Sequence, residues 1–495
     1  MALQQRKTEK VTEMDKKRWM IRYLMIAGIG AVLAIKIYLL LFVVDLTVGI
    51  YSFFTSFILF NIFFISFTRY KDPYLDAKDI VLSNDNKPLV SMVVPVKNEE
   101  GNIRNCVQSC INSTYSNKEI IIVNDGSNDS TPQILDEMKK EEPLLRIIHL
   151  SKSVGKKQAI EAACEIAKGD IFLFMDSDCD IASDALERAV KIFLSDRKIG
   201  AVTGHARVRD AAKGNVLLKI QDVWFDGQYR LLKGMETTYS SLTCCSGSLS
   251  IFRRAAVKPY IHAWAHDKFL GIEDFKFATD RRLTAYVLGE KPFPVLPNDD
   301  KNQHVSHSGG EGSNNNFNIP ILLQTGKDGL HTMKSSSDPD IDSPKKNPRY
   351  AWRLVYSPSV RASAGVPETF TALLKQQIRW RKSFIRSIFA TGGIYWRRPL
   401  WPAVLYYLQI SLKLLRPIII MKALIFLPLS GDFATTALYI IGALYSGMLY
   451  GIDVRLRSPG YKFWIYRPIM TFISTFIFSW LVIYAAITIR KTGWR

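Results

Sequence analysis

Two aspartates at the end of an apolar run are the residues of this sequence best suited to chemistry. Asp176 and Asp178 follow the run 170–175 with one serine between them. On extended chain, residues two apart point to the same face, so the two carboxylates could share a hard divalent cation, Mg²⁺ or Mn²⁺. Such an ion would neutralise a diphosphate leaving group. A solvated turn is the alternative, but Asp125 at the end of a neighbouring run favours the metal site.

The segments that carry these aspartates alternate between short apolar runs and amphipathic stretches. This alternation predicts an α/β domain with a doubly wound, mostly parallel sheet. Ligands of such sheets bind at the carboxyl ends of the strands, where the polar segments 97–100, 124–127 and 176–178 fall. The predicted strands are 89–96, 119–123, 145–150, 170–175 and 199–203, and the predicted helices are 103–111, 132–139, 156–167 and 182–194.

A second group of residues with chemical potential lies beyond this domain. Gln376, Arg379 and Trp380 are spaced i, i+3 and i+4, so on a helix they share one face. An amphipathic helix on the membrane surface is the alternative explanation, because basic and apolar residues are interleaved here. The two interpretations are compatible, since such a helix could close a site from the membrane side.

Several function classes lose support from motifs and composition. No Gly-x-Gly-x-x-Gly follows the first predicted strand and no phosphate-loop motif occurs, which disfavours dinucleotide binding and ATP hydrolysis. Only six cysteines occur among 495 residues, all in the polar middle, which fits a reducing compartment. We attribute the net charge of +20 mostly to loops beside anionic lipid, because no basic–aromatic module indicates nucleic-acid binding.

The apolar residues are concentrated at the two ends of the chain and predict membrane helices. The stretches 21–44 and 46–67 are each long enough to cross a bilayer, which takes about 20 apolar residues. A cleaved signal peptide is disfavoured because the second stretch follows at once. Six basic residues lie in the first 18 positions, so we expect a cytoplasmic N-terminus and, after two crossings, a cytoplasmic middle domain.

Further membrane helices are expected after residue 400, although the sequence leaves their number open. The first apolar stretch there contains Lys413, Arg416 and Lys422. A cation in lipid is costly, so such residues usually face a bundle interior or a watery path; snorkelling to the interface is an equal alternative. The basic tail favours a cytoplasmic C-terminus. The apolar stretches are 401–429, 434–452 and 464–489.

Several segments, in order, resemble the family-two inverting glycosyltransferases, the processive membrane synthases that include hyaluronan, chitin and cellulose synthases. The similarity covers roughly 90–386, and its most specific signal is Gln-x-x-Arg-Trp at 376–380. The other segments are 94–99, 123–127, 155–159 and 176–178.

Within that family the sequence is most similar to hyaluronan synthases, through the segments 245–254, 269–272 and 280–284. It departs from their pattern in three places. Ser248 replaces a proline, Ala278 and Thr279 replace Gly-Asp, and the stretch at about 291–350 resembles a loop insertion.

The resemblance implies a GT-A-like domain and assigns roles to individual residues. Asp280 would be the catalytic base on the acceptor hydroxyl, with Glu273 and Asp274 as a rival pair. Asp178 and Asp176 would bind Mg²⁺ or Mn²⁺. The remaining implied residues bind the nucleotide sugar (Pro95, Lys97, Glu99, Asp125, Lys156, Asp176, Gln376 and Arg379) or the acceptor (Cys245, Ser246, Gly247 and Trp380).

The resemblance and the apolar pattern together predict the domain organisation. We expect a basic cytoplasmic N-terminus (1–20), two transmembrane helices (21–68), a cytoplasmic glycosyltransferase domain (69–370), amphipathic interface helices (371–400) and C-terminal transmembrane helices (401–495).

By resemblance, the protein is a multi-pass enzyme of the cell membrane that transfers sugars from UDP-sugars to a β-linked polysaccharide with inversion and exports it through its own helices. UDP-GlcNAc and UDP-GlcA, the donors for hyaluronan, are favoured. A chitin-like or other exopolysaccharide synthase is one alternative. A non-processive transferase acting on a lipid carrier is another, which the Gln-x-x-Arg-Trp helix disfavours. A transporter or scaffold with a degenerate domain is disfavoured by the intact aspartates.

Overall fold

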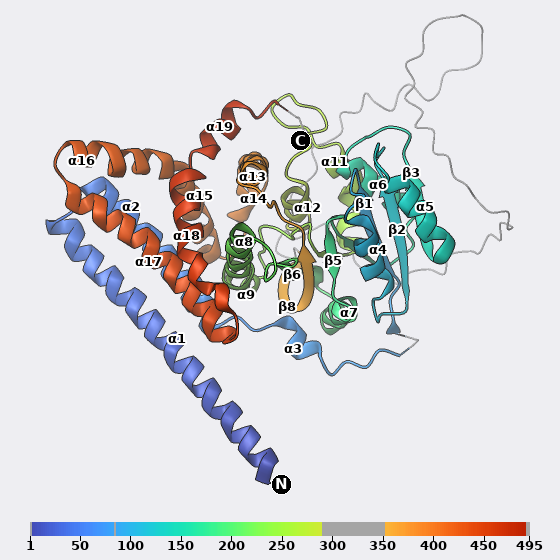
Figure 1. Ribbon diagram of the computed structural model, residues 1–495, viewed down its shortest axis with the longest axis horizontal. Helices are drawn as coiled ribbons and strands as arrows, with labels where there is room; N and C mark the ends of the chain where they lie inside the picture. The colour runs from blue at the N-terminus through green and yellow to red at the C-terminus, as the bar shows by residue number, and fades with distance from the viewer. Residues whose placement is uncertain (1, 84–85, 290–351, 492–495) are drawn as a thin grey trace, which may run out of the picture.

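An eight-stranded mixed sheet forms the centre of the domain that follows the first two helices (Figure 1). The computed structural model describes residues 2–83, 86–289 and 352–491, with side chains from residue 16, so the predicted insertion at 291–350 lies outside the described residues. The strand order is β3-β2-β1-β4-β7-β6-β8-β5. The strands are β1 (Val90–Val96), β2 (Lys118–Asn124), β3 (Leu145–His149), β4 (Ile171–Phe174), β5 (Cys179–Ile181), β6 (Ile199–Val208), β7 (Ser250–Arg253) and β8 (Arg353–Ala364).

One half of the sheet confirms the predicted doubly wound arrangement. The strand β1 pairs in parallel with β2 and β4, and β2 pairs in parallel with β3. Each of the predicted strands and helices of this half is present within a few residues of its predicted bounds. The helices are α4 (Ile103–Ile111), α5 (Thr131–Glu141), α6 (Lys156–Ile166) and α7 (Ala185–Ser195).

The other half of the sheet contains strands that the sequence did not predict. The short strand β7 lies antiparallel between β4 and β6. The long strand β8 pairs in parallel with β6 and antiparallel with β5. Both strands lie far along the chain from some of the strands with which they pair, so their positions depend on long-range pairing. The prediction of a mostly parallel sheet holds for the first half, and β7 and β5 add antiparallel pairings to the second.

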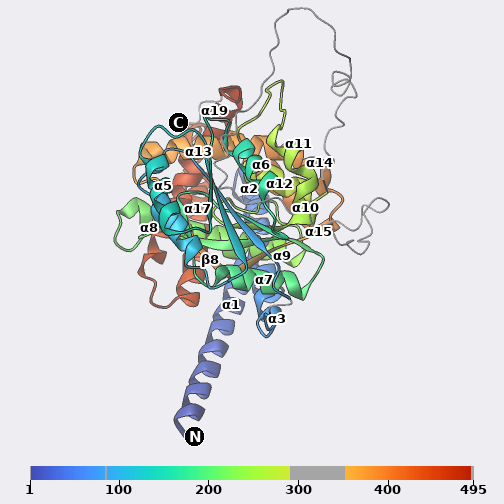
Figure 2. The ribbon, with the colours of Figure 1, turned by 90° about the vertical axis from the view of Figure 1, so that its right-hand side faces the viewer.

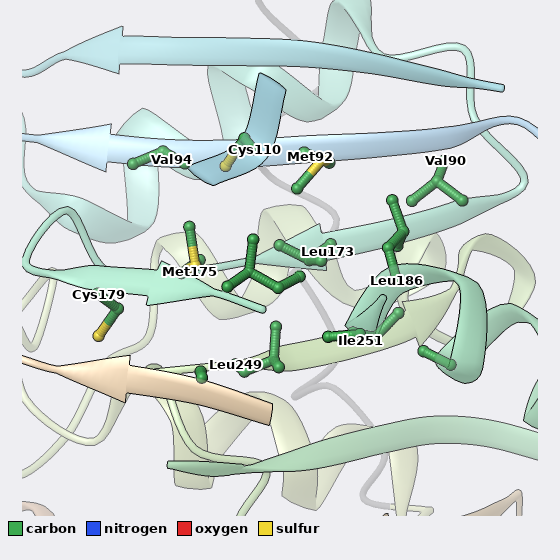
Figure 3. Packing of buried hydrophobic residues seen from close by; sticks show 14 of the residues in the cluster. Val90, Met92, Val94, Cys110, Leu173, Met175, Cys179, Leu186, Leu249 and Ile251 are labelled. Atoms are coloured by element: carbon green, nitrogen blue, oxygen red, sulfur yellow. The ribbon is translucent and has the colours of Figure 1, made fainter. Parts of the chain in front are cut away.

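Both faces of the sheet are buried, as expected for strands covered by helices on each side. Successive residues of β1 alternate between two apolar clusters: Met92 and Val94 face α4 and α7, whereas Val93 faces α6. Figure 3 shows the first cluster, in which Leu173 and Ile251 continue the same layer across β4 and β7. Burial on both faces fixes the register of the strands and thereby the position of their carboxyl ends.

The remaining helices divide between this domain and an apolar group on one side of the molecule. In Figure 1, α1, α2 and α17 lie on the side away from β1–β3, and Figure 2 shows α1 extending beyond the rest of the molecule. The remaining helices are α1 (Ala2–Phe42), α2 (Leu46–Thr68), α3 (Pro73–Ala77), α8 (Val216–Gly227), α9 (Gly234–Thr238), α10 (Arg254–Val257), α11 (Ile261–Ala265), α12 (Thr279–Val287), α13 (Phe370–Ala390), α14 (Gly392–Tyr395), α15 (Leu400–Met421), α16 (Leu427–Leu429), α17 (Phe433–Arg457), α18 (Arg467–Phe472) and α19 (Leu481–Ile487).

Three helical segments of the described chain are long and apolar enough to cross a membrane: Lys16–Phe42, Leu46–Ala77 and Phe433–Arg457. A bent pair, Lys462–Ile477 with Leu481–Ile487, makes a fourth if it is one span. The helix α15, within the predicted stretch 401–429, is not among them.

Candidate active site

A single cavity of about 1360 Å³ gathers nearly all of the side chains that the sequence singles out. It lies where β1, β2 and β4 end, as expected for a doubly wound sheet. The predicted residues on its wall are Pro95, Lys97, Glu99, Asp125, Lys156, Asp176, Asp178, Ser246, Gly247, Asp280, Gln376, Arg379 and Trp380.

Gly247 lies between two of the aspartates. Because β7 pairs with β4, the turn before β7 meets the segment after β4. The Asp176 N–H donates to the Gly247 carbonyl at 2.9 Å, and the Gly247 N–H donates to Asp280 Oδ2 at 2.8 Å. A Cβ atom at residue 247 would lie 2.8 Å from Asp176 Oδ2 and 2.9 Å from Asp280 Oδ2. The missing side chain of Gly247 therefore allows two carboxylates from distant segments to approach each other.

The helix α12 presents Asp280 from its first turn, where the helix dipole favours a carboxylate. The residue before the helix, Ala278, has φ 63° and ψ 29°. This left-handed conformation costs an L-residue roughly 1–2 kcal/mol. The family that the sequence resembles has a glycine at this position. Ala278 adopts the same left-handed turn, but its side chain makes that conformation strained.

Lys156, the first residue of α6, links the aspartates of the two segments. Its amine forms an ion pair with Asp176, and its Nζ lies 3.8 Å from Asp280 Oδ1. Burial opposes the charge of the amine, but Asp176 and Asp280 outweigh it and raise the pKa of Lys156. The amine therefore stays protonated beside the carboxylates.

The aspartates of the cavity carry more negative charge than this amine balances. Burial, and then the charge of Asp176, raises the pKa of Asp178 to about 6. Burial also raises the pKa of Asp280, with Lys156 opposing and Asp176 adding to the shift. Asp176 and Asp178 thus fit a Mg²⁺ or Mn²⁺ ion. Within the described residues they form no cluster of three acidic ligands within 4.8 Å, which suits a metal that takes its other oxygens from substrate phosphates and water.

Asp125 holds the loop that begins α6. Its Oδ1 accepts from the Val154 N–H at 2.6 Å, and its Oδ2 accepts from the Gly155 N–H at 3.0 Å and from the Ser153 hydroxyl at 2.8 Å. The side chain is buried at the end of β2. Asp125 thus positions the N-terminus of α6, and with it Lys156, as well as lining the cavity.

Gln376, Arg379 and Trp380 lie on the helix α13, where their spacing places them on one face, and all three line the cavity. The Oε1 atom of Gln376 is buried and has no hydrogen-bond partner among the described residues. The ring of Trp380 packs beside the rings of Trp224 and Phe225 on α8, with centroids 5.7 and 6.2 Å away. The three rings are tilted against one another and line the cavity, where a sugar ring can stack on an exposed ring face.

Cys245 is the one predicted site residue that the structure places away from the cavity wall. Its side chain is packed in the apolar core beside α6 and α12, and burial raises the pKa of its thiol to about 12. The neighbouring Cys244 lines the cavity instead. The residue types of adjacent cysteines could not show which of the two points inward. All six cysteines are free.

The cavity continues from the aspartates to the apolar helices. Thr55 and Ile58 of α2, Lys413 of α15 and Tyr450 of α17 lie on its wall. Within the described chain, α2, α13, α15 and α17 contribute six cationic residues to the wall and no carboxylate. The six are Lys375, Arg379, Arg381, Lys382, Lys413 and Arg416.

A second charged group, which we call the Asp267 cluster, lies buried behind the cavity. Asp267 accepts hydrogen bonds from Arg282 Nε at 2.9 Å and from Arg386 Nη2 at 2.7 Å, and Lys157 Nζ lies 3.6 Å from it. All four side chains are buried. The cluster joins α6, α12 and α13, the three helices that carry Lys156, Asp280 and Arg379.

The sequence did not indicate this cluster. Lys157 and Arg282 fall in the family-like segments 155–159 and 280–284, and Arg386 reads as a basic residue of an amphipathic helix. Asp267, which lies in a short loop after α11, carries no signal of its own. One feature of the sequence could have indicated the cluster: each of the three basic residues lies after a predicted site residue on the same helix. Such a position suits a residue that supports the site from behind.

The comparisons with known proteins agree with this geometry. Residues 91–261 match the family model "Glycosyl transferase family 2". The chain therefore carries a family 2 glycosyltransferase domain. It is 25% identical over 414 residues to the hyaluronan synthase of Streptococcus pyogenes, covering 82% of each chain. It is 30% identical over 203 residues to the poly-β-1,6-N-acetyl-D-glucosamine synthase of Staphylococcus epidermidis, covering 41% of this chain and 48% of that one.

A solved mannosyltransferase from Pyrobaculum calidifontis, in complex with GDP-Man and Mn²⁺, aligns with a TM-score of 0.46 at 18% identity, over 88% of this chain and 98% of that one. The resemblance found in the sequence is confirmed: residues 91–261 match the family 2 glycosyltransferase model, and the chain is similar to hyaluronan synthases. Together with this similarity, the apolar helices indicate a membrane protein.

Proposed function

We propose that this protein is a processive polysaccharide synthase that transfers sugars from UDP-sugars to a β-linked chain with inversion, and exports the polymer through its own helices. The observation that carries the proposal is the cavity, which is continuous from Asp176 and Asp280 at the sheet edge to α2, α15 and α17. Similarity to two polysaccharide synthases supports the reaction class.

The chemistry requires a base for the acceptor hydroxyl and stabilisation of the leaving diphosphate. Asp280 is the proposed base, because it lines the cavity and burial raises its pKa, which makes its carboxylate a better proton acceptor. Glu273 is exposed and paired with Lys268, and Asp274 bonds His266, which disfavours the rival pair. Trp380, Cys244 and Ser246 would contact the acceptor.

The leaving diphosphate would be stabilised by positive charges from two parts of the site. Lys156 lies at the N-terminus of α6, whose backbone N–H groups and dipole favour phosphate, and Arg379 offers a guanidinium suited to phosphate oxygens. Pro95, Lys97, Glu99 and Asp125 would frame the nucleotide. Asp176 and Asp178 would hold a Mg²⁺ or Mn²⁺ ion, which when bound supplies positive charge to the diphosphate.

The wall charges favour an anionic polymer. Beyond the aspartates, the four lining helices offer cations without carboxylates, a lining that attracts a chain containing uronic acid. Hyaluronan, made from UDP-GlcNAc and UDP-GlcA, is therefore favoured over a neutral chitin-like polymer. A multi-pass arrangement with the transferase domain in the cytoplasm follows from the basic N-terminus and the need for cytosolic donors.

The decisive experiment supplies purified protein with Mg²⁺ or Mn²⁺ and with UDP-GlcNAc, UDP-GlcA or both, followed by linkage-specific hydrolases. We expect long polymer only with both donors and complete digestion by a hyaluronan-specific lyase. Polymer from one donor would indicate a chitin-like or other homopolymer, and short lipid-linked product would indicate a non-processive transferase. Asp280→Asn is the matched inactive control, because it should retain nucleotide binding.

A further inference from the structure

Two histidines and a glutamate converge on the surface formed by α6 and α11. The Nδ1 atom of His262 lies 2.8 Å from Glu161 Oε1, and the Nε2 atom of His266 lies 3.2 Å from Glu161 Oε2. The ligand atoms of all three residues lie within 4.8 Å of one another, and in the described chain no other three His, Cys, Asp or Glu residues meet this condition. The site is outside the proposed catalytic residues and uses none of them.

The donor set distinguishes this group from the aspartates of the cavity. Two imidazoles and one carboxylate suit Zn²⁺ and similar transition metals, whereas Mg²⁺ prefers oxygen ligands alone. With bonds of about 2.0–2.1 Å, tetrahedral zinc ligands lie roughly 3.3 Å apart. The two histidine–glutamate separations are close to this spacing, and the imidazole nitrogens lie within 4.8 Å of each other.

Asp274 provides a second observation that points to a metal. The Nδ1 atom of His266 lies 3.1 Å from Asp274 Oδ1, while its Nε2 atom faces Glu161. Both ring nitrogens of His266 therefore face carboxylates, one inside the three-residue group and one outside it. A carboxylate on the outer nitrogen of a histidine is the usual arrangement that orients a metal-bound imidazole.

We propose that Glu161, His262 and His266 bind a Zn²⁺-type ion, with Asp274 orienting His266. The fourth ligand is a water molecule, because the histidines are exposed. The ion joins Glu161 of α6 to His262 of α11 and to His266, which directly follows that helix. Since His266 directly precedes Asp267, the ion also fixes the backbone position next to the Asp267 cluster. We expect bound zinc to stabilise the protein, not to take part in sugar transfer.

The test uses full-length protein in detergent without a histidine tag, with excess Mg²⁺ to occupy the aspartates. Zinc is counted by mass spectrometry after dialysis, and its affinity is measured against a chromophoric chelator. We expect wild type to bind one more Zn²⁺ per chain than His262→Ala and to show a higher melting temperature with zinc. Asp274→Asn should weaken binding by about 10–100-fold.

The control is His149→Ala, which removes a half-buried histidine that contacts Asn124 and a single carboxylate, Asp136, and should bind zinc like wild type. Because the His262 side chain is 80% exposed, its replacement should leave the fold intact. Equal zinc stoichiometry and affinity in wild type and His262→Ala would overturn the proposal. That result would not bear on the proposed synthase activity, which is assayed separately.

Discussion

The aspartates of the cavity and the Asp267 cluster are built with opposite charge balance. In the cavity, Asp176 and Asp280 share the amine of Lys156 and remain about one-third exposed. Asp178 adds a third carboxylate to the same wall. In the Asp267 cluster, one carboxylate serves three cations and every side chain is buried.

The difference separates a binding site from its support. Carboxylates that outnumber the cations at a cavity can bind an added metal ion, and the open space beside them can hold a substrate. A buried carboxylate with hydrogen-bonded cations leaves no such room and fixes the elements around it. Neighbouring residues divide between the two groups: Lys156 faces the cavity and Lys157 faces Asp267, while Asp280 faces the cavity and Arg282 faces Asp267. One set of helices thus serves both.

The largest expected effect is on catalysis alone. Asp280→Asn should lower polymer synthesis by about 10²–10⁴-fold, because a general base contributes that much, while UDP binding and the melting temperature stay near wild type. Turnover is measured as UDP release and binding by calorimetry. Glu273→Gln, which changes an exposed rival carboxylate, should remain active. Full activity in Asp280→Asn would remove the proposed base.

For the Asp267 cluster we expect a loss of stability together with activity. Asp267→Asn leaves buried cations without their carboxylate, which typically costs about 3–5 kcal/mol. Folded yield and melting temperature should fall together with activity. Asp76→Asn is the control, because Asp76 forms an exposed ion pair with Lys71 that should contribute at most about 1 kcal/mol. An Asp267→Asn protein as stable as wild type would contradict the supporting role.

Gly247→Ala tests how closely the aspartates must approach. The added Cβ would lie under 3.0 Å from both Asp176 and Asp280, and displacement of reacting groups by about 1 Å costs roughly 10²-fold in rate. We expect that loss of turnover with a folded protein. Gly101→Ala, where nothing lies within 4 Å of the new atom, should behave as wild type, and similar activities in the two variants would count against this close packing.

Metal affinity should depend on pH through Asp178. With a pKa of about 6, its carboxylate is mostly ionised at pH 7 and mostly protonated at pH 5, so Mn²⁺ affinity should fall by about tenfold over that interval. An Asp at its ordinary pKa would change little there. Mn²⁺ titrations followed by electron paramagnetic resonance measure this, and the profile of Asp178→Asn should be flatter.

The smallest effect concerns the strained alanine before α12. Ala278→Gly relieves a left-handed conformation that costs roughly 1–2 kcal/mol, against a chain-entropy loss of about 0.5–1 kcal/mol for glycine. Thermal unfolding should therefore shift upward slightly, with a net gain of up to about 1 kcal/mol. Ala285→Gly within the same helix should lower stability, because glycine is unfavourable there. A lower melting temperature for Ala278→Gly would exclude strain at this position.

Local patterns predicted much of the fold and of the site. The parallel strands β1 to β4 and helices α4 to α7 were predicted because apolar periodicity and chain order are local properties. The face shared by Gln376, Arg379 and Trp380 followed from helical spacing in the same way. The strand β7 could not be predicted, since a four-residue segment carries little pattern and its pairing depends on contacts far along the chain.

The sequence alone determined the residue types at the strand ends, the amphipathic helix α13 and the apolar ends of the chain, because these depend on near neighbours. Only the tertiary structure decided that Gly247 lets Asp176 and Asp280 approach each other, that Cys244 and not Cys245 faces the cavity, and that Asp267 contacts three cations. Those outcomes depend on which distant segments meet in the folded chain, and long-range packing is not encoded in any short stretch of residues.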